Sequence, residues 1–86
     1  MIEILLKQEK NRTVALDNNK IIGECDFVIK DNLWNIVHTI VNSSYQGQGI
    51  ARKLVLCIID KAKCENASVI AACSYAKKVL GEQNEI

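Results

Sequence analysis

The segment Gln46-Gly47-Gln48-Gly49-Ile50-Ala51 has the residue types of an anion-binding turn between a strand and a helix. The first turn of a helix leaves backbone N–H groups without partners, and the helix dipole places partial positive charge there. Small residues at alternate positions let a phosphate group approach these N–H groups closely. The segment therefore predicts binding of a phosphate or pyrophosphate group. The alternative is a plain turn whose glycines supply only flexibility.

Two common glycine motifs do not explain the segment. The dinucleotide-binding fingerprint requires a third Gly or Ala where Arg52 stands, and it normally follows the first strand of a parallel unit. A Walker loop ends in Gly-Lys-Ser or Gly-Lys-Thr, which does not occur in this sequence.

Three landmarks in the chain carry a resemblance to a known family. Gln46, Gly49 and Ala51 occupy the defined positions of the pattern Gln/Arg-x-x-Gly-x-Gly/Ala. This resembles the acetyl-coenzyme A pyrophosphate motif of the GCN5-related N-acetyltransferases. His38-Thr39 precedes it and Cys73-Ser74-Tyr75-Ala76 follows it, as in a branch of very small proteins of that superfamily, the YjdJ-like branch. The resemblance covers roughly the whole chain.

The resemblance implies where acetyl-coenzyme A would bind. The N–H groups of residues 47–52 would hold the pyrophosphate, and Gln46 would orient the loop. The main chain from Thr39 to Val41 would pair with the pantetheine arm, and an N–H near Ile40 or Val41 would polarise the thioester carbonyl. Lys77 and Lys78 would either meet the 3′-phosphate or only solvate a helix. The predicted cofactor contacts are Thr39, Ile40, Val41, Gln46, Gly47, Gln48, Gly49, Ile50, Ala51, Arg52, Ser74 and Lys77.

Cys73 is the first candidate catalytic residue. Larger members of the superfamily often have Asn near this position and a general-acid Tyr near the position of Leu80, so the resemblance implies that the usual acid is missing. Cys73 would open a short helix with Lys77 one turn further on, and both features favour a thiolate. It could act as nucleophile, as acid to the departing coenzyme, or only as packing against the acetyl group.

His38 is the second candidate catalytic residue. We expect it on a strand with Ile36 and Ile40 on the same face, where a lone histidine is commonly a satisfied core residue. An imidazole can also transfer protons near neutral pH, and His38 is the only obvious base for deprotonating an amine. Tyr75 could donate through its hydroxyl group or pack in the core.

The N-terminal half of the chain predicts consecutive antiparallel strands joined by short turns. Ile2 to Lys7 alternates as a half-buried strand does, and residues 13–16, 21–29 and 33–41 are further strands. In the third strand we expect the apolar odd positions, beginning with Ile21, to face the core. The fourth is rich in β-branched residues and is expected to be covered on both faces.

The C-terminal half predicts a long helix from Gly47 to about Glu65, a strand over 68–72, and one or two helical turns that Gly81 ends. The apolar stripe of the long helix consists of Ile50, Ala51, Leu54, Val55, Ile58, Ile59 and Ala62. A strand, a helix and a strand imply a parallel pair with a right-handed crossover. We therefore expect an α+β fold, a mainly antiparallel mixed sheet with one long helix and a short C-terminal helix, over a single domain of residues 1–86.

Composition restricts the class of protein. The chain has 86 residues, 49% of them apolar, a net charge of +1, and scattered Lys and Arg, which argues against a nucleic-acid footprint. It contains no apolar run long enough for a membrane span and no leader. Its four cysteines include no Cys-x-x-Cys pair, and the one histidine lies far from any close cysteine pair, which argues against a metal site. We expect a reduced, cytoplasmic protein.

The leading functional hypothesis is a minimal N-acetyltransferase that transfers acetyl from acetyl-coenzyme A to the amine of a small molecule or peptide by direct attack. The alternatives are an acetyl-coenzyme A sensor with little turnover and an interaction domain without a ligand. By the resemblance, larger relatives wall the acceptor groove with two N-terminal helices for which this chain has no room. The acceptor site is therefore open, shared with a partner as in a homodimer, or absent.

Overall fold

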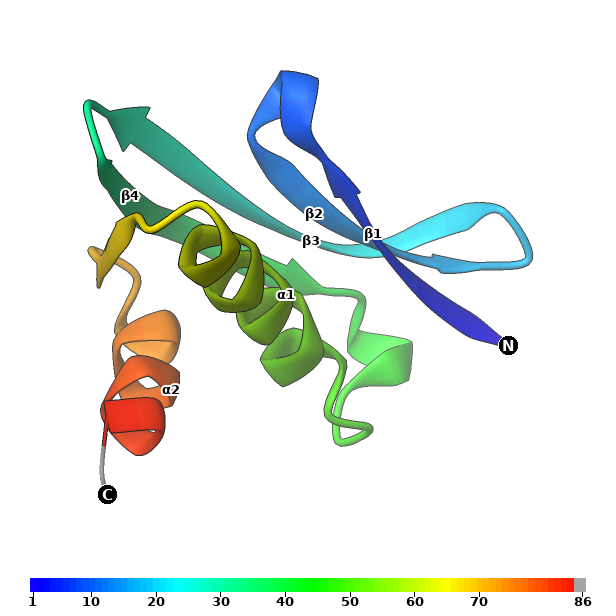
Figure 1. Cartoon of the computed structure of the whole chain (residues 1–86). Coiled ribbons are helices and arrows are strands. Elements are labelled where there is room, and N and C mark those ends of the chain that lie inside the picture. Colours follow the sequence, from blue (N-terminus) through cyan, green and yellow to red (C-terminus); the bar gives the residue numbers. More distant parts are fainter. Residues whose placement is uncertain (85–86) are drawn as a thin grey trace.

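The computed structural model describes residues 1–84 of the chain and has the expected α+β architecture (Figure 1). Its elements are β1 (Ile2–Lys7), the 3-10 turn η1 (Gln8–Lys10), β2 (Arg12–Asp17), β3 (Lys20–Lys30), β4 (Leu33–Val41), the 3-10 turn η2 (Ser43–Tyr45), α1 (Ile50–Cys64), β5 (Ser68–Ala71) and α2 (Ser74–Asn84). The strands lie in sequence order in one sheet. β1 to β4 pair antiparallel, and β5 pairs parallel with β4.

Short polar turns connect the antiparallel strands. Asn18 and Asn19 have φ angles of 50° and 69°, and Asp31 has a φ of 56°. Asn and Asp tolerate this left-handed region better than most residues, so these turns reverse the chain within very few residues. The expected succession of antiparallel strands joined by short turns is therefore confirmed.

Two register shifts change which side chains face the core. Leu16 lies opposite Ile21, and Ala15 lies opposite Gly23, so Ile22 is an extra residue. This bulge buries Ile22 to 2% exposure and leaves Ile21 60% exposed. The prediction that Ile21 faces the core is wrong, because the alternation changes phase at the bulge.

The second register shift lies in β4. Asp26 lies opposite His38 and Phe27 lies opposite Ile36, so Val37 is the extra residue. Ile36 is fully buried, whereas Ile40 is 53% exposed and His38 is exposed. Two predictions are therefore wrong: His38 does not share the face of Ile36, and β4 is not covered on both faces.

Both helices lie on one face of the sheet (Figure 1), and we call the opposite face the outer face. α1 contacts all five strands through the predicted apolar stripe, of which only Ala51 is not fully buried. The Thr13 hydroxyl donates to the Leu54 carbonyl at 3.2 Å and joins β2 to the middle of the helix. Phe27 and Trp34 stack with ring centroids 5.0 Å apart under the β3–β4 turn. This packing fixes the start of α1 beside the end of β4.

The ends of the helices differ from the predictions. α1 begins at Ile50 instead of Gly47, because Gly49 is the N-cap residue with a φ of 76°. α2 continues through Gly81 to Asn84 instead of ending there. Ala76 and Val79 are buried against the rest of the core, and this packing outweighs the low helix propensity of one exposed glycine.

The substitution Gly81→Ala tests the continuation of α2. A Cβ atom at Gly81 would meet no other atom within 4 Å. Alanine loses less conformational entropy in a helix, so we expect the free energy of unfolding to rise by about 0.5–1 kcal/mol. Thermal and urea unfolding measure the change. A decrease in stability would mean that α2 does not pass through Gly81 as described.

Candidate functional site

The glycine segment lines a hollow at the start of α1. The hollow has a volume of about 330 Å³ and is lined by Val41, Tyr45, Gln46, Gly47, Gly49, Ile50, Ala51 and Tyr75. It therefore joins the end of β4, the loop and the first turn of α1 with the first turn of α2. Six of the predicted cofactor contacts meet there, and Tyr45 and Tyr75 complete the wall.

The first turn of α1 offers unsatisfied backbone donors. No side chain caps the helix, and its first turn contains no acidic residue. The Lys53 N–H donates to the Gly49 carbonyl at 3.2 Å and is the first bond of the helix. The N–H groups of Ile50, Ala51 and Arg52 therefore have no intrahelical acceptor in the part of the chain described. Such a helix start binds an anion well.

The two glycines of the hollow are needed for their backbone conformation. Gly47 and Gly49 have φ angles of 85° and 76°, in the region that side chains strain. A Cβ atom at either position would meet no other atom of the protein within 4 Å. The left-handed conformation of both glycines is required by the loop that leads into α1, whether or not the loop holds an anion.

β4 and β5 separate beyond Ile36, and we call this divergence the β4–β5 fork. Their pairing ends at Ile36 and Ala71, and the N–H groups of Ala72 and Cys73 both donate to the Ile36 carbonyl, at 2.9 and 3.1 Å. The remaining half of β4, from Val37 onward, has no neighbour on that side within residues 1–84. The fork leads from Cys73 to the hollow at Val41.

Backbone groups of β4 point into the fork. The Asn42 N–H donates to the Ile22 carbonyl at 2.7 Å, which sets the alternation of the antiparallel ladder. Ile40 consequently bonds toward β3, whereas the N–H and C=O groups of Thr39 and Val41 face away from β3. Of the two amides expected to polarise a thioester, only that of Val41 is directed into the fork.

Cys73 lies at the inner end of the fork and contacts Thr39. Its Sγ atom lies 3.6 Å from the Thr39 Oγ1 atom, and the Cys25 Sγ atom lies 3.3 Å from the same hydroxyl oxygen. Cys25 is fully buried, whereas Cys73 is only half-buried. One hydroxyl group therefore links an inaccessible thiol to an accessible one.

The pKa values of the two thiols are shifted in opposite directions. Burial raises the pKa of Cys25 to about 11, although the hydrogen bond with Thr39 acts against it. Burial also acts to raise the pKa of Cys73. Hydrogen bonds from the Ala76 N–H, the Thr39 hydroxyl and the N–H groups of Tyr75 and Thr39 outweigh it, so this pKa lies below its ordinary value. Cys73 is the thiol equipped to act as a thiolate.

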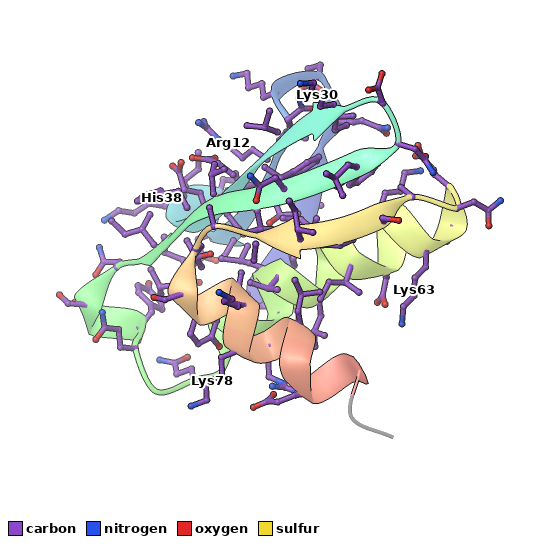
Figure 2. All side chains as sticks on the ribbon, turned by 90° about the vertical axis from the view of Figure 1, so that its left-hand side faces the viewer. Arg12, Lys30, His38, Lys63 and Lys78 are labelled. Carbon is purple, nitrogen blue, oxygen red and sulfur yellow. The ribbon has the colours of Figure 1, made fainter. Side chains whose placement is uncertain are left out.

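His38 lies on the outer face, away from Cys73. Arg12, Asp26 and His38 occupy adjacent positions across β2, β3 and β4. Figure 2 shows His38 and Arg12 on the same side of the sheet, away from the helices. Arg12 Nε donates to Asp26 Oδ1 at 2.7 Å. Because β4 is open beyond Val37, His38 flanks the fork from the side opposite Cys73.

Two contacts hold the hollow to the rest of the fold. The Tyr45 hydroxyl donates to Asp17 Oδ2 at 2.5 Å, which lowers the pKa of Asp17 and raises that of Tyr45. The Arg52 guanidinium pairs with the Glu82 carboxylate, so the first turn of α1 is tied to α2. The Arg52 guanidinium is thereby shared with Glu82, whereas the Arg52 backbone N–H is one of the unpaired amides of the first turn.

The remaining predicted contacts lie outside the hollow. Thr39 lines the fork, Ile40 lies on the outer face, and Gln48, Ser74 and Lys77 are exposed. Sequence reasoning missed Tyr45 as part of the wall. Its position directly before Gln46 was the available signal, since the residue that enters such a loop often packs against it. Tyr75 stood among the candidates as a donor or packing residue, and it lines the hollow.

The chain was compared with known protein families and structures. The family model of the GCN5-related N-acetyl-transferases matches residues 12–86. The chain belongs to this family. No curated protein matches it. The solution structure of a GCN5-like protein from Staphylococcus aureus is 33% identical, with a TM-score of 0.72 over 95% of this chain and 80% of that chain.

Two larger acetyltransferase-fold structures contain coenzyme A. N-acetylglutamate synthase of Neisseria gonorrhoeae, complexed with coenzyme A and N-acetyl-glutamate, is 20% identical, with a TM-score of 0.71 over 93% of this chain. The PaiA N-acetyltransferase of Thermoplasma acidophilum in complex with coenzyme A is 18% identical, with a TM-score of 0.62 over 65% of this chain. This family member spans only 22% and 35% of those chains, so they support the shared fold.

Within residues 1–84 no helix is long and apolar enough to cross a membrane. No group of three His, Cys, Asp or Glu side chains in the same range is placed to hold a metal ion.

The acidity of Cys73 can be measured in this family member by thiol alkylation. The background variant Cys64→Ser removes the one fully exposed cysteine. We expect iodoacetamide to modify Cys73 at a lower pH than Cys57, whose pKa is raised mainly by burial, and to leave Cys25 unmodified until the fold opens. Peptide mass mapping across pH identifies the order. Earlier modification of Cys57 or Cys25 would contradict the assignment.

Proposed function

We propose that the chain is a minimal N-acetyltransferase that binds acetyl-coenzyme A and transfers the acetyl group to an amine through Cys73. One observation carries the proposal: the uncapped start of α1 and the open edge of β4 meet at Val41, and a thiol of lowered pKa lies at the other end of the same fork. Residues 1–86 would act as one domain in the reducing cytoplasm, where its free thiols persist.

The pyrophosphate would lie in the hollow. The N–H groups of residues 47–52 supply donors, and Gln46 orients the loop. Tyr45 and Tyr75 would flank the phosphates. Ser74 and Lys77, on the first turn of α2, would contact the cofactor from the opposite side. The landmarks His38-Thr39 and Cys73-Ser74-Tyr75 support placing it in the YjdJ-like branch.

The pantetheine arm would follow the β4–β5 fork. It would bond to the Thr39 carbonyl and to the main-chain groups of Val41, which have no strand partner on that side. The Val41 N–H would donate to the thioester carbonyl oxygen and stabilise negative charge that develops there. This route brings the thioester from the hollow toward Cys73.

Cys73 would accept the acetyl group first. Its thiolate attacks the carbonyl carbon, the bond between that carbon and the coenzyme A sulfur breaks, and coenzyme A leaves as a thiolate that takes a proton from solvent. An amine then attacks acetyl-Cys73 and releases the Cys73 thiolate. His38, on the other side of the fork, would accept the proton that the amine loses. The half-buried position of Cys73 beside Thr39 and the lowered pKa of its thiol support this two-step route.

Binding of the cofactor is tested by thermal stability with and without acetyl-coenzyme A. At about one hundred times the dissociation constant, the ligand should stabilise the fold by roughly 2.7 kcal/mol. Gly49→Ala places a side chain at a φ of 76° and should weaken binding. Gly81→Ala is the matched control, since Gly81 does not line the hollow and does not have a left-handed φ. If ligand stabilises neither the natural chain nor the control, the proposal is wrong.

The role of Cys73 is tested by intact-protein mass after incubation with acetyl-coenzyme A and no amine. We expect one added acetyl group, mapped to Cys73, and none in Cys73→Ser, whose alcohol is a far weaker nucleophile at neutral pH. Cys64→Ser is the control and should still be acetylated. If Cys73→Ala binds acetyl-coenzyme A and still acetylates amines at the natural rate, transfer is direct and Cys73 is structural.

A further inference from the structure

A second hollow of about 330 Å³ lies on the outer face, where β3 begins and β4 ends. It is lined by Ile21, Ile22, Gly23, Glu24, Ile40, Val41, Asn42 and Ser43. Val41 also lines the hollow at the start of α1, so the two hollows approach the same residue from different sides. Apart from Val41, none of the residues proposed above to contact the cofactor lines this second hollow.

The bulge at Ile22 accounts for the shape of the second hollow. Ile22 is turned into the core, and a Cβ atom at Gly23 would also point inward, toward the side chains of Val41 and Leu54. Two successive residues therefore leave no side chain on the outer face at this point. Ile21 and Ile40 remain as walls, 60% and 53% exposed. The floor is backbone, closed by the bond from the Asn42 N–H to the Ile22 carbonyl.

Among the residues that line the second hollow, Glu24 is the one with a charged side chain. Glu24 lies opposite Ile40 in the sheet, and its side chain is only 29% exposed. Arg12 makes its short bond to Asp26, at 2.7 Å, and reaches Glu24 only at 3.5 Å. One guanidinium thus faces two carboxylates and bonds more closely to Asp26, so the Glu24 carboxylate is the less tightly paired of the two. A cation near Glu24 would be attracted, and an anion would be repelled.

We infer that the second hollow binds the acceptor, a primary amine with an apolar body. Its ammonium group would meet Glu24, and its aliphatic or aromatic part would pack on Ile21 and Ile40. This inference rests on the proposed function. Because β4 has no neighbour beyond Val37 on its fork side, an amine that lies over Ile40 can cross the open strand edge to the acetyl group.

Transfer of the acetyl group to the amine would then take place on the outer face. The ammonium loses one proton to His38, which lies two residues from Ile40 on the same face. The amine nitrogen forms a bond to the acetyl carbon, the bond from that carbon to the Cys73 sulfur breaks, and the thiolate is restored, while the second proton that the nitrogen loses passes to solvent. An amine that carries its own carboxylate beside the nitrogen would be repelled by Glu24. The acceptor class is therefore a cationic amine without a neighbouring acidic group.

The experiment uses the full chain, acetyl-coenzyme A, and two probe amines, phenethylamine and glutamate. Coenzyme A release is measured with a thiol reagent, and Cys73 acetylation is measured by mass. We expect phenethylamine to be acetylated and glutamate not. Glu24→Gln and Ile40→Ser should each lower kcat/KM for phenethylamine by about tenfold, and leave Cys73 acetylation unchanged. Glu24→Gln should also reduce the preference for phenethylamine over glutamate.

Val28→Ser is the matched control, because Val28 is exposed to the same 53% as Ile40 but lies outside the second hollow. It should leave the kcat/KM for phenethylamine unchanged. An equal loss in Val28→Ser, or no loss in Glu24→Gln and Ile40→Ser, would overturn the inference while Cys73 acetylation upholds the proposed function. Absence of Cys73 acetylation would instead contradict the proposed function.

Amide chemical shifts provide a readout of binding that does not depend on turnover. Phenethylamine added to the acetylated chain should shift the amide signals of Ile21, Gly23 and Glu24, and should shift that of Val28 less. If phenethylamine is not acetylated and these signals do not move, the second hollow is not the acceptor site.

Discussion

The function proposed for this chain depends on one interruption of backbone pairing, the extra residue Val37 in β4. It shifts the register against β3, and β4 also stops pairing with β5 one residue earlier, at Ile36. Every buried peptide group needs a partner, so a half-strand without a neighbour is a place where a ligand can supply one. The same residue turns His38 to the outer face and leaves Thr39 beside Cys25 and Cys73. A continuous β4–β5 ladder would close the route between the hollow and the thiol.

The second requirement is a helix that starts without a cap. Most helices begin at a side chain that accepts a bond from the first turn, but α1 begins at a left-handed glycine, and its first turn is free of acidic groups. Core packing of Leu54, Val55 and Ile58 stabilises the helix from within, so its first amides can remain unpaired. The hollow thus exists because the stability of α1 comes from the sheet beneath it.

Local sequence patterns predicted the helices and strands well, but they predicted less well which side chains face the core. The turns at Asn18-Asn19 and Asp31, the stripe of α1 and the strand–helix–strand crossover were readable, because each depends on residues close together in the sequence. The sequence did not show on which face of the sheet Ile21 and His38 lie. Each lies next to a β-bulge, which changes the alternation of side chains between the two faces, and the position of a bulge depends on the partner strand. Gly81 was read as a helix end, although the contacts of Ala76 and Val79 carry α2 past it.

The sequence by itself determined the family landmarks: the glycine segment, His38-Thr39 and Cys73-Ser74-Tyr75. It also determined the α+β order of elements, because propensity, periodicity and turn chemistry are local. Only the tertiary structure decided that Cys73 lies beside Thr39 and that His38 lies on the far side of the fork. It alone showed that Arg52 is held by Glu82 and that a second hollow meets the first at Val41. These relations join residues many positions apart, and only the packing of α1 and α2 on one face of the sheet brings them together.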